Sequence, residues 1–136
     1  MTDRTLVDTN VLLDVLADDP TWGTWSSQAL ASAFDAGEVV INQIIYAEVS
    51  AGFSRIEDLE DALPPSQFAR EELPWRAGFV AAKAFVDYRR RGGKRVSTLP
   101  DFYIGAHAAV SGMSLLTRDR GRYATYFPTV RLIIPD

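Results

Sequence analysis

Four short apolar runs, interspersed with segments of helical character, constrain the fold of this 136-residue chain most strongly. They lie at residues 4–7, 38–41, 114–117 and 131–134. Strands that are covered on both faces read as nearly continuous apolar runs, and alternation of such strands with helices favours a parallel sheet. We therefore predict a three-layer α/β/α sandwich with a mainly parallel central sheet.

The predicted helices are bounded by residue types that commonly cap or end helices. Thr9 or Asn10 is expected to cap the first helix, and Asn42 the third. Ser97 or Thr98 is expected to precede the last helix. The predicted helices cover about residues 10–16, 24–36, 43–49, 56–63, 76–91 and 99–111. No repeat, low-complexity tract or linker divides the chain, so a single domain over residues 1–136 is predicted.

The composition excludes several classes of protein. The chain is 47% hydrophobic and 24% charged, which is ordinary for a globular domain and argues against disorder. It has no cysteine, which excludes disulfides, a thiolate nucleophile and a cysteine-bound zinc cluster. No apolar run approaches the roughly 20 residues of a membrane span, and the start of the chain lacks the apolar core of a signal peptide. A cytoplasmic protein with no membrane association is expected.

Four acidic residues stand within apolar surroundings, at the end of a predicted strand or in a predicted helix: Asp8, Glu48, Asp101 and Asp119. Carboxylates in such positions are costly to bury unless they are paired, protonated or bound to a cation. Functional sites of α/β folds collect at the carboxyl ends of strands, where Asp8 and Asp119 fall. If the four acids converge, they would bind a hard metal ion such as Mg²⁺ or Mn²⁺ and support phosphoryl chemistry.

Each acid also has a purely structural explanation. Asp8 could cap a helix, and Asp119 could lie in a loop or cap position. Asp101 falls in a first helical turn, where the helix dipole favours a negative charge. Glu48 could be an exposed glutamate, although it shares a helix face with the apolar Ile44. The hypothesis of a metal site therefore rests on the four acids taken together.

The segments that carry these acids resemble those of PIN-domain ribonucleases, and more closely those of the VapC toxins of bacterial toxin–antitoxin pairs. The similar segments are LVDTNVLLD, IIYAEV, LPDFYIGAHA and LLTRDRGRYATYF, which together span nearly the whole chain. The resemblance implies a PIN-like fold and a metal-dependent endoribonuclease that hydrolyses structured RNA such as tRNA or ribosomal RNA. It also implies a homodimer, a small VapB-like antitoxin as inhibitor, and a heterotetramer or larger complex with that antitoxin.

The resemblance assigns roles to individual residues as well. It implies that the catalytic acids, which would bind Mg²⁺ or Mn²⁺, are Asp8, Glu48, Asp101 and Asp119. Asn10 and Thr117 become candidates for groups that orient a carboxylate or a water molecule.

The formal net charge of −4 speaks against a nucleic-acid partner, but the distribution of charge matters more than its sum. Basic residues that could contact the RNA backbone flank Asp119 or follow the predicted helix 76–91: Arg118, Arg120, Arg122, Arg89, Arg91 and Lys94. Cations at the end of a helix also interact favourably with its dipole, so a solvated helix end is the alternative explanation for the second group.

Other polar and aromatic residues are given structural interpretations. His107 is the only histidine, and we expect a structural or partly exposed role for it. Asp14 lies beyond Asp8 on the first predicted helix and could lean toward the candidate site, but it is interpreted as a surface charge. The aromatic residues of the early segments are assigned to the core or to a protein interface in preference to base stacking: Trp22, Trp25, Tyr46 and Phe53.

Two other functions remain open from the sequence. A structure-specific DNA nuclease of the flap-endonuclease type is less favoured because the chain has no added arch or DNA clamp. A non-catalytic RNA-binding or interaction module would use the acids only for structure. A phosphatase with an aspartate nucleophile is disfavoured, because the segment Asp8-Thr9-Asn10 lacks the second aspartate of an Asp-x-Asp pair.

Overall fold

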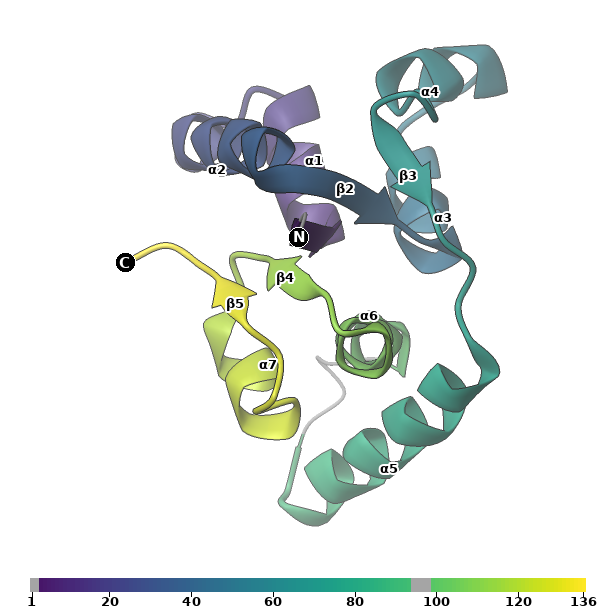
Figure 1. Cartoon of the computed structure of the whole chain (residues 1–136), viewed down its shortest axis with the longest axis vertical. Coiled ribbons are helices and arrows are strands. Elements are labelled where there is room, and N and C mark those ends of the chain that lie inside the picture. The colour runs from purple at the N-terminus through teal and green to yellow at the C-terminus, as the bar shows by residue number, and fades with distance from the viewer. Residues whose placement is uncertain (1–2, 94–98) are drawn as a thin grey trace.

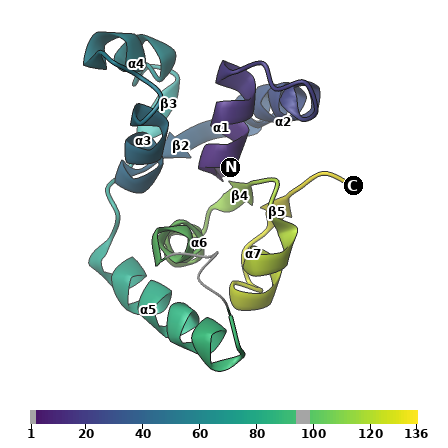
Figure 2. The ribbon, with the colours of Figure 1, turned by 180° about the vertical axis from the view of Figure 1, so that it is seen from behind.

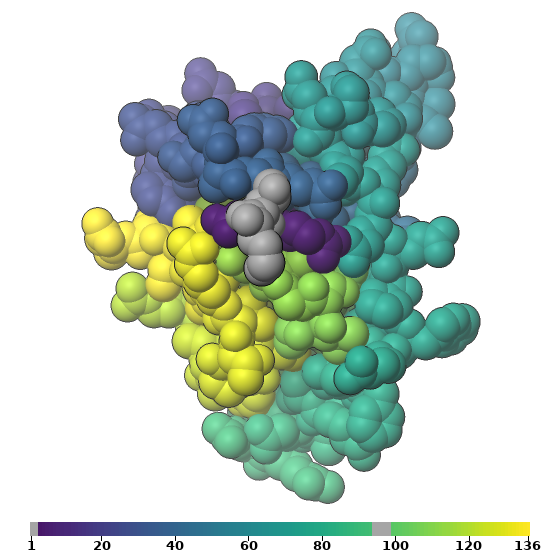
Figure 3. Space-filling view, viewed as in Figure 1, coloured from purple at the N-terminus to yellow at the C-terminus, as the bar shows by residue number. Residues whose placement is uncertain are grey.

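A computed structural model describes residues 3–93 and 99–136. Within these residues, five strands form one sheet in the order β3-β2-β1-β4-β5, and every neighbouring pair is parallel. The strands are β1 (Asp3–Val7), β2 (Gly37–Ile41), β3 (Phe68–Arg70), β4 (Ser114–Leu116) and β5 (Leu132–Ile133). Figure 3 shows the start of β1, in purple, between the blue segment of β2 and the green and yellow C-terminal segments. The predicted parallel sheet is confirmed.

Helices lie on both sides of this sheet, so the predicted α/β sandwich is also confirmed. In Figures 1 and 2, α1 and α2 lie on one side of the strands and α5, α6 and α7 on the other, with α3 and α4 beside β3. The helices are α1 (Thr9–Leu16), α2 (Gly23–Ala36), α3 (Gln43–Ser50), α4 (Ile56–Ala62), α5 (Trp75–Arg90), α6 (Leu99–Ser111) and α7 (Arg120–Tyr126).

The observed helix starts correct one prediction and support another. Asp8, and not Thr9 or Asn10, is the N-cap of α1, and its side chain accepts a hydrogen bond from the Thr9 backbone N–H. Asn42 caps α3 as predicted, with its side-chain oxygen accepting from the backbone N–H of Ile45. Two elements, β3 and α7, are absent from the sequence predictions. The remaining strands and helices match the predicted ranges to within a few residues at each end.

Two predictions fall on residues that the structure does not describe. The expected helix cap at Ser97 or Thr98 and the proposed RNA contact Lys94 both lie in the segment 94–98, outside the described residues. Within the described ranges, no helix combines the length and the apolar character needed to cross a membrane.

The core is centred on β1, β2 and β4, and it determines where the polar strand ends meet. Leu6, Val40 and Leu115 from these three strands are completely buried. Apolar burial is the main force that holds such a layer in place. Because the strands are parallel, their carboxyl ends share one edge of the sheet. Asp8 follows β1 at that edge and Thr117 follows β4.

Candidate functional site

Asp8 is the most buried of the four acids, with 6% of its surface exposed at the carboxyl end of β1. Its Oδ2 accepts hydrogen bonds from the Thr117 hydroxyl at 2.7 Å and the Tyr123 hydroxyl at 3.2 Å. Its Oδ1 accepts from the backbone N–H of Thr9 at 2.8 Å. The Asn10 amide nitrogen lies 3.4 Å from Oδ2 and 3.5 Å from the Thr117 hydroxyl. Asn10 and Thr117, the two predicted orienting groups, are therefore both placed beside this carboxylate.

The surroundings of Asp8 disfavour its charged form. Burial raises the pKa of Asp8 from 3.8 to about 6, although the hydrogen bonds from Thr117, Thr9 and Tyr123 act in the opposite direction. The negative charge of Asp101 raises this pKa further. Burial also raises the pKa of Tyr123 well above 10, with the charges of Asp8 and Asp101 adding to the effect. Tyr123 is therefore a neutral hydrogen-bond donor to Asp8, and the donors around Asp8 leave its negative charge without full compensation.

Glu48 reaches the same region from the exposed side of α3. Its Oε1 accepts a hydrogen bond from the Thr9 hydroxyl at 2.7 Å. Thr9 is buried, and its backbone N–H is bonded to Asp8, so this one residue links the two acids. Thr9 is a site residue that is not among those predicted from the sequence. Its position directly after Asp8, with a hydroxyl group, is the only signal for it in the sequence.

Asp101 and Asp119 are brought together around Arg122. Asp119 is the N-cap of α7, and its backbone N–H donates to the Thr117 hydroxyl at 3.0 Å. Arg122 Nη1 lies 2.8 Å from Asp119 Oδ2 and 3.7 Å from Asp101 Oδ2. Asp101 lies near enough to Asp8 for its charge to affect the pKa of Asp8. The structure therefore gathers all four predicted acids on one edge of the sheet.

The donor chemistry of this edge fits a hard divalent cation. All four acids offer oxygen atoms, the ligands that Mg²⁺ and Mn²⁺ prefer. Within residues 3–93 and 99–136, no group of three or more His, Asp or Glu side chains lies close enough together to hold a metal ion. In the arrangement described, the positive charge beside Asp101 and Asp119 is that of Arg122.

The interpretation of Asp14 as a surface charge is wrong. Asp14 is only 4% exposed, and both of its carboxylate oxygens bond to Arg118, at 2.6 and 3.0 Å. The Ser26 hydroxyl donates to the same carboxylate at 2.6 Å, and the Arg118 guanidinium lies 5.2 Å from the centre of the Trp22 ring. Arg118, one of the predicted RNA contacts, therefore ties the segment before Asp119 to α1 and α2.

The other predicted RNA contacts differ in whether their side chains are engaged with other residues. Arg120 is exposed on α7, and it forms no ion pair within the described part of the chain. Arg89 is exposed near the end of α5, with its guanidinium 6.0 Å from the centre of the Phe85 ring. Arg91 is paired with Asp87 at 3.2 Å. Arg120 and Arg89 are thus the two exposed cations of this group for which no ion pair is found among the described residues.

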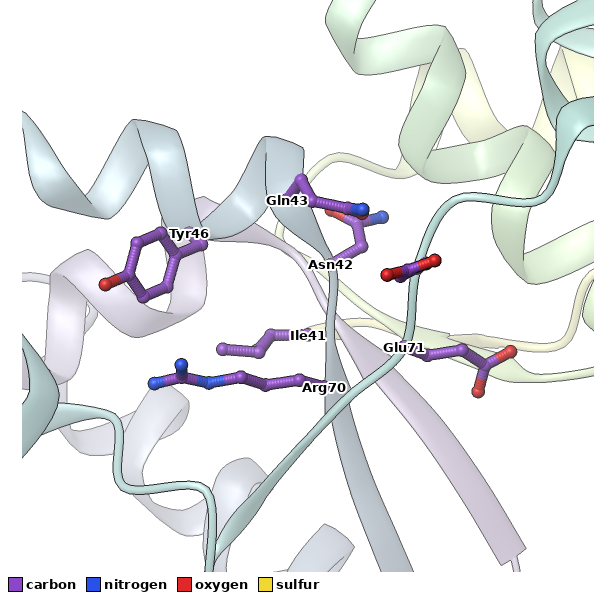
Figure 4. Close-up of a pocket in the computed structure, with 7 residues that line it drawn as sticks. Ile41, Asn42, Gln43, Tyr46, Arg70 and Glu71 are labelled. Carbon is purple, nitrogen blue, oxygen red and sulfur yellow. The ribbon is translucent and has the colours of Figure 1, made fainter.

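A pocket of about 350 Å³ lies beside the ends of β2 and β3, away from the four acids. Two of the residues that line it are bonded to Glu60, which accepts hydrogen bonds from the Tyr46 hydroxyl at 2.7 Å and from Arg70 at 2.8 Å. Figure 4 shows the Arg70 side chain extending below the Tyr46 ring, whereas Glu71 points to the opposite side. The residues that line the pocket are Ile41, Asn42, Gln43, Tyr46, Arg70, Glu71 and Glu72. The Tyr46 hydroxyl and the Arg70 guanidinium of this pocket are thus both bonded to Glu60.

His107 is completely buried, so the expectation of partial exposure is not met and its role is structural. Its Nδ1 lies 3.0 Å from the side-chain amide nitrogen of Asn42, the cap of α3. Burial, followed by the positive charge of Arg4, lowers the pKa of His107 to about 4. The imidazole is therefore neutral near pH 7 and accepts a hydrogen bond from Asn42.

The chain is similar to a known protein family and to several solved structures. A family model described as "PIN domain" matches residues 5–128. No curated protein matches the chain. Among solved structures, VapBC2 from Rickettsia felis bound to a promoter DNA fragment is similar with a TM-score of 0.75 at 17% identity, over 98% of this chain and 99% of that one. FitAcB from Neisseria gonorrhoeae is similar with a TM-score of 0.71 at 20% identity, over 94% and 95% of the two chains.

Proposed function

The chain belongs to the PIN-domain family, and from that membership we propose that it is a metal-dependent endoribonuclease, the toxin of a VapBC-type toxin–antitoxin pair. The observation that carries the proposal is the buried Asp8 carboxylate at the carboxyl end of β1, with Asp101 close enough to raise its pKa. A partly uncompensated negative charge among other acids is what a divalent cation would stabilise. The proposed substrate is structured RNA such as tRNA or ribosomal RNA.

Four side chains would hold Mg²⁺ or Mn²⁺ once they are drawn closer together than in the arrangement described: Asp8, Glu48, Asp101 and Asp119. When bound, the ion lowers the pKa of a water molecule and stabilises the negative charge that develops on the scissile phosphate. The chain's own hydroxyl groups fix the directions of two of these carboxylates. Thr117 and Tyr123 donate to Asp8, and Thr9 donates to Glu48.

Arg120 and Arg89 are the proposed contacts to the RNA backbone, because both side chains are exposed. A guanidinium group suits phosphate oxygens because it can donate two parallel hydrogen bonds. Arg91, which directly follows α5, is proposed as a further contact, and Lys94 is proposed with it from the sequence alone. Arg118 is already bonded to Asp14, so its proposed role is to hold the segment that carries Asp119.

The proposed partners are a small VapB-like antitoxin and a second copy of the chain. The relatives from Rickettsia felis and Klebsiella pneumoniae are a VapBC2 complex and a toxin–antitoxin complex. On this chain, α5 presents an apolar face on which Trp75 is 98% exposed and Phe79 is 67% exposed, with Val86 further along the helix. Exposed apolar patches of this kind are typical of protein interfaces, so we assign this face to assembly.

The proposal is tested by offering the purified protein a structured RNA and a DNA of the same sequence, with Mg²⁺, with Mn²⁺ and with a chelator. We expect discrete cuts in the RNA only when a metal ion is present. Cleavage of the DNA with the RNA intact would favour the structure-specific DNA nuclease. Tight RNA binding with no cleavage under any condition would favour the non-catalytic binding module.

A further inference from the structure

The position of Arg122 is unusual for a residue that serves only to bind substrate. Its guanidinium lies 2.8 Å from Asp119 and 3.7 Å from Asp101, and its side chain is only 18% exposed. Both partners belong to the acids proposed to hold a metal ion. A permanently charged group therefore already occupies the neighbourhood that a divalent cation would enter.

Arg120 provides a direct comparison on the same short helix. It carries the same charge two residues earlier, but its side chain is exposed and forms no ion pair with the described residues. Arg122 thus contacts the acids because of where it lies on α7, and not merely because α7 carries positive charges. Any effect that depends on this position should be absent when Arg120 is changed.

We propose that Arg122 is an internal counter-cation that competes with the divalent metal ion for Asp101 and Asp119, and so sets the metal concentration at which the site fills. This inference rests on the proposed function. Without a metal ion, Arg122 offsets the repulsion between neighbouring carboxylates. When an ion binds, the ion replaces that attraction and is repelled by the guanidinium. Arg122 is therefore a positioning residue for the acids in addition to any contact with RNA.

Simple electrostatics gives the size of the effect. A single positive charge about 5 Å from a divalent ion, in surroundings close to water, should weaken binding of that ion by about tenfold. Removing the charge should strengthen binding by the same factor. A residue that contacted only RNA phosphates would leave the affinity for the metal ion unchanged, which distinguishes the two roles.

The test is a calorimetric titration with Mn²⁺ of the wild-type protein, Arg122→Gln, Arg122→Lys and the matched control Arg120→Gln, each without RNA. We expect Arg122→Gln to bind Mn²⁺ about tenfold more tightly than the wild type. Arg122→Lys and Arg120→Gln should stay within about threefold of the wild type, because the first keeps the local charge and the second removes an exposed charge that forms no ion pair with the described acids. Equal or weaker binding by a folded Arg122→Gln protein would overturn the proposal.

A second measurement on the wild-type protein avoids dependence on a variant that folds poorly. The side-chain Nε–H resonance of Arg122 should shift as Mg²⁺ is added, while that of Arg120 stays in place. An Arg122 resonance that does not move while Asp119 resonances do would contradict the inference and leave the nuclease proposal intact. Absence of saturable metal binding by the folded wild type and all variants would instead overturn both.

Discussion

Replacement of Asp8 by asparagine is expected to reduce metal-dependent RNA cleavage by about a thousandfold, because loss of a metal ion's stabilisation amounts to several kcal/mol and each 1.36 kcal/mol is a factor of ten in rate. The substitution keeps the shape of the side chain and one oxygen, which can replace either Oδ1, the acceptor from the Thr9 N–H, or Oδ2, the acceptor from Thr117. It removes the charge that would bind the ion. Initial rates of cleavage of a labelled RNA in Mg²⁺ measure the effect.

Stability provides the control for this variant. The pKa of Asp8 is raised from 3.8 in the unfolded chain to about 6 in the folded protein, because burial favours the protonated carboxyl group. The folded protein is therefore destabilised by this group as the pH rises from 3.8 through 6, and below pH 3.8 that loss of stability is absent. Without metal, the free energy of unfolding of the asparagine variant should therefore rise by about 3 kcal/mol relative to that of the wild type as the pH is raised from about 4 to about 7. The lowered pKa of His107 acts in the opposite direction, with stability lost as the pH falls from 6.5 to about 4, but both proteins share it. Retained cleavage, or lost cleavage with an unfolded variant, would contradict this account.

Replacement of Asp14 by alanine is expected to lower the free energy of unfolding by about 3 kcal/mol, because breaking a buried ion pair leaves charged and polar groups without partners. Here the groups left behind are the Arg118 guanidinium and the Ser26 hydroxyl. The expected loss is at the lower end of the usual range, since 28% of the Arg118 side chain is exposed and water can partly replace the carboxylate. Unfolding in urea measures the difference.

An exposed ion pair in the same chain serves as the matched control. Arg55 and Glu57 lie 3.1 Å apart with both side chains more than half exposed. Replacing Arg55 by alanine should change the free energy of unfolding by no more than about 0.5 kcal/mol. If the Asp14 and Arg55 variants lose equally little stability, the pair between Asp14 and Arg118 does not hold the segment before Asp119 as proposed.

The sequence predicted the central strands well and missed two marginal elements for physical reasons. Residues 39–41 and 115–116 are apolar and buried in the parallel sheet, and that pattern is visible without a structure. The β3 strand has only three residues, including Ala69 and Arg70, and is strand-like only because it pairs with β2. The α7 helix contains Gly121 and Thr125, which have low helix propensity, so packing of Tyr123 in the core accounts for it better than local preference.

The candidate site likewise contains residues that the sequence predicted and residues that only the structure reveals. The acids could be identified from the sequence because each stands in an apolar segment or at the end of one. The partners that orient them come from distant parts of the chain, as with the hydroxyl of Tyr123 on Asp8. Asp14 was misinterpreted because a charged residue on a short helix is usually exposed, and its partner Arg118 is 104 residues away. Such pairings depend on the tertiary fold.

The central claim is that water attacks an RNA phosphodiester with the help of a divalent cation held by the four acids. End-group analysis of RNA fragments made by the wild-type protein, with Mg²⁺ and with a chelator, tests it most directly. The account predicts fragments only with Mg²⁺. At each cut, one new end should carry a phosphate monoester that a phosphatase removes and the other a free hydroxyl, because water is the attacking group. Fragments that form in the chelator and end in a 2′,3′-cyclic phosphate would show attack by the RNA's own 2′-hydroxyl and would contradict it.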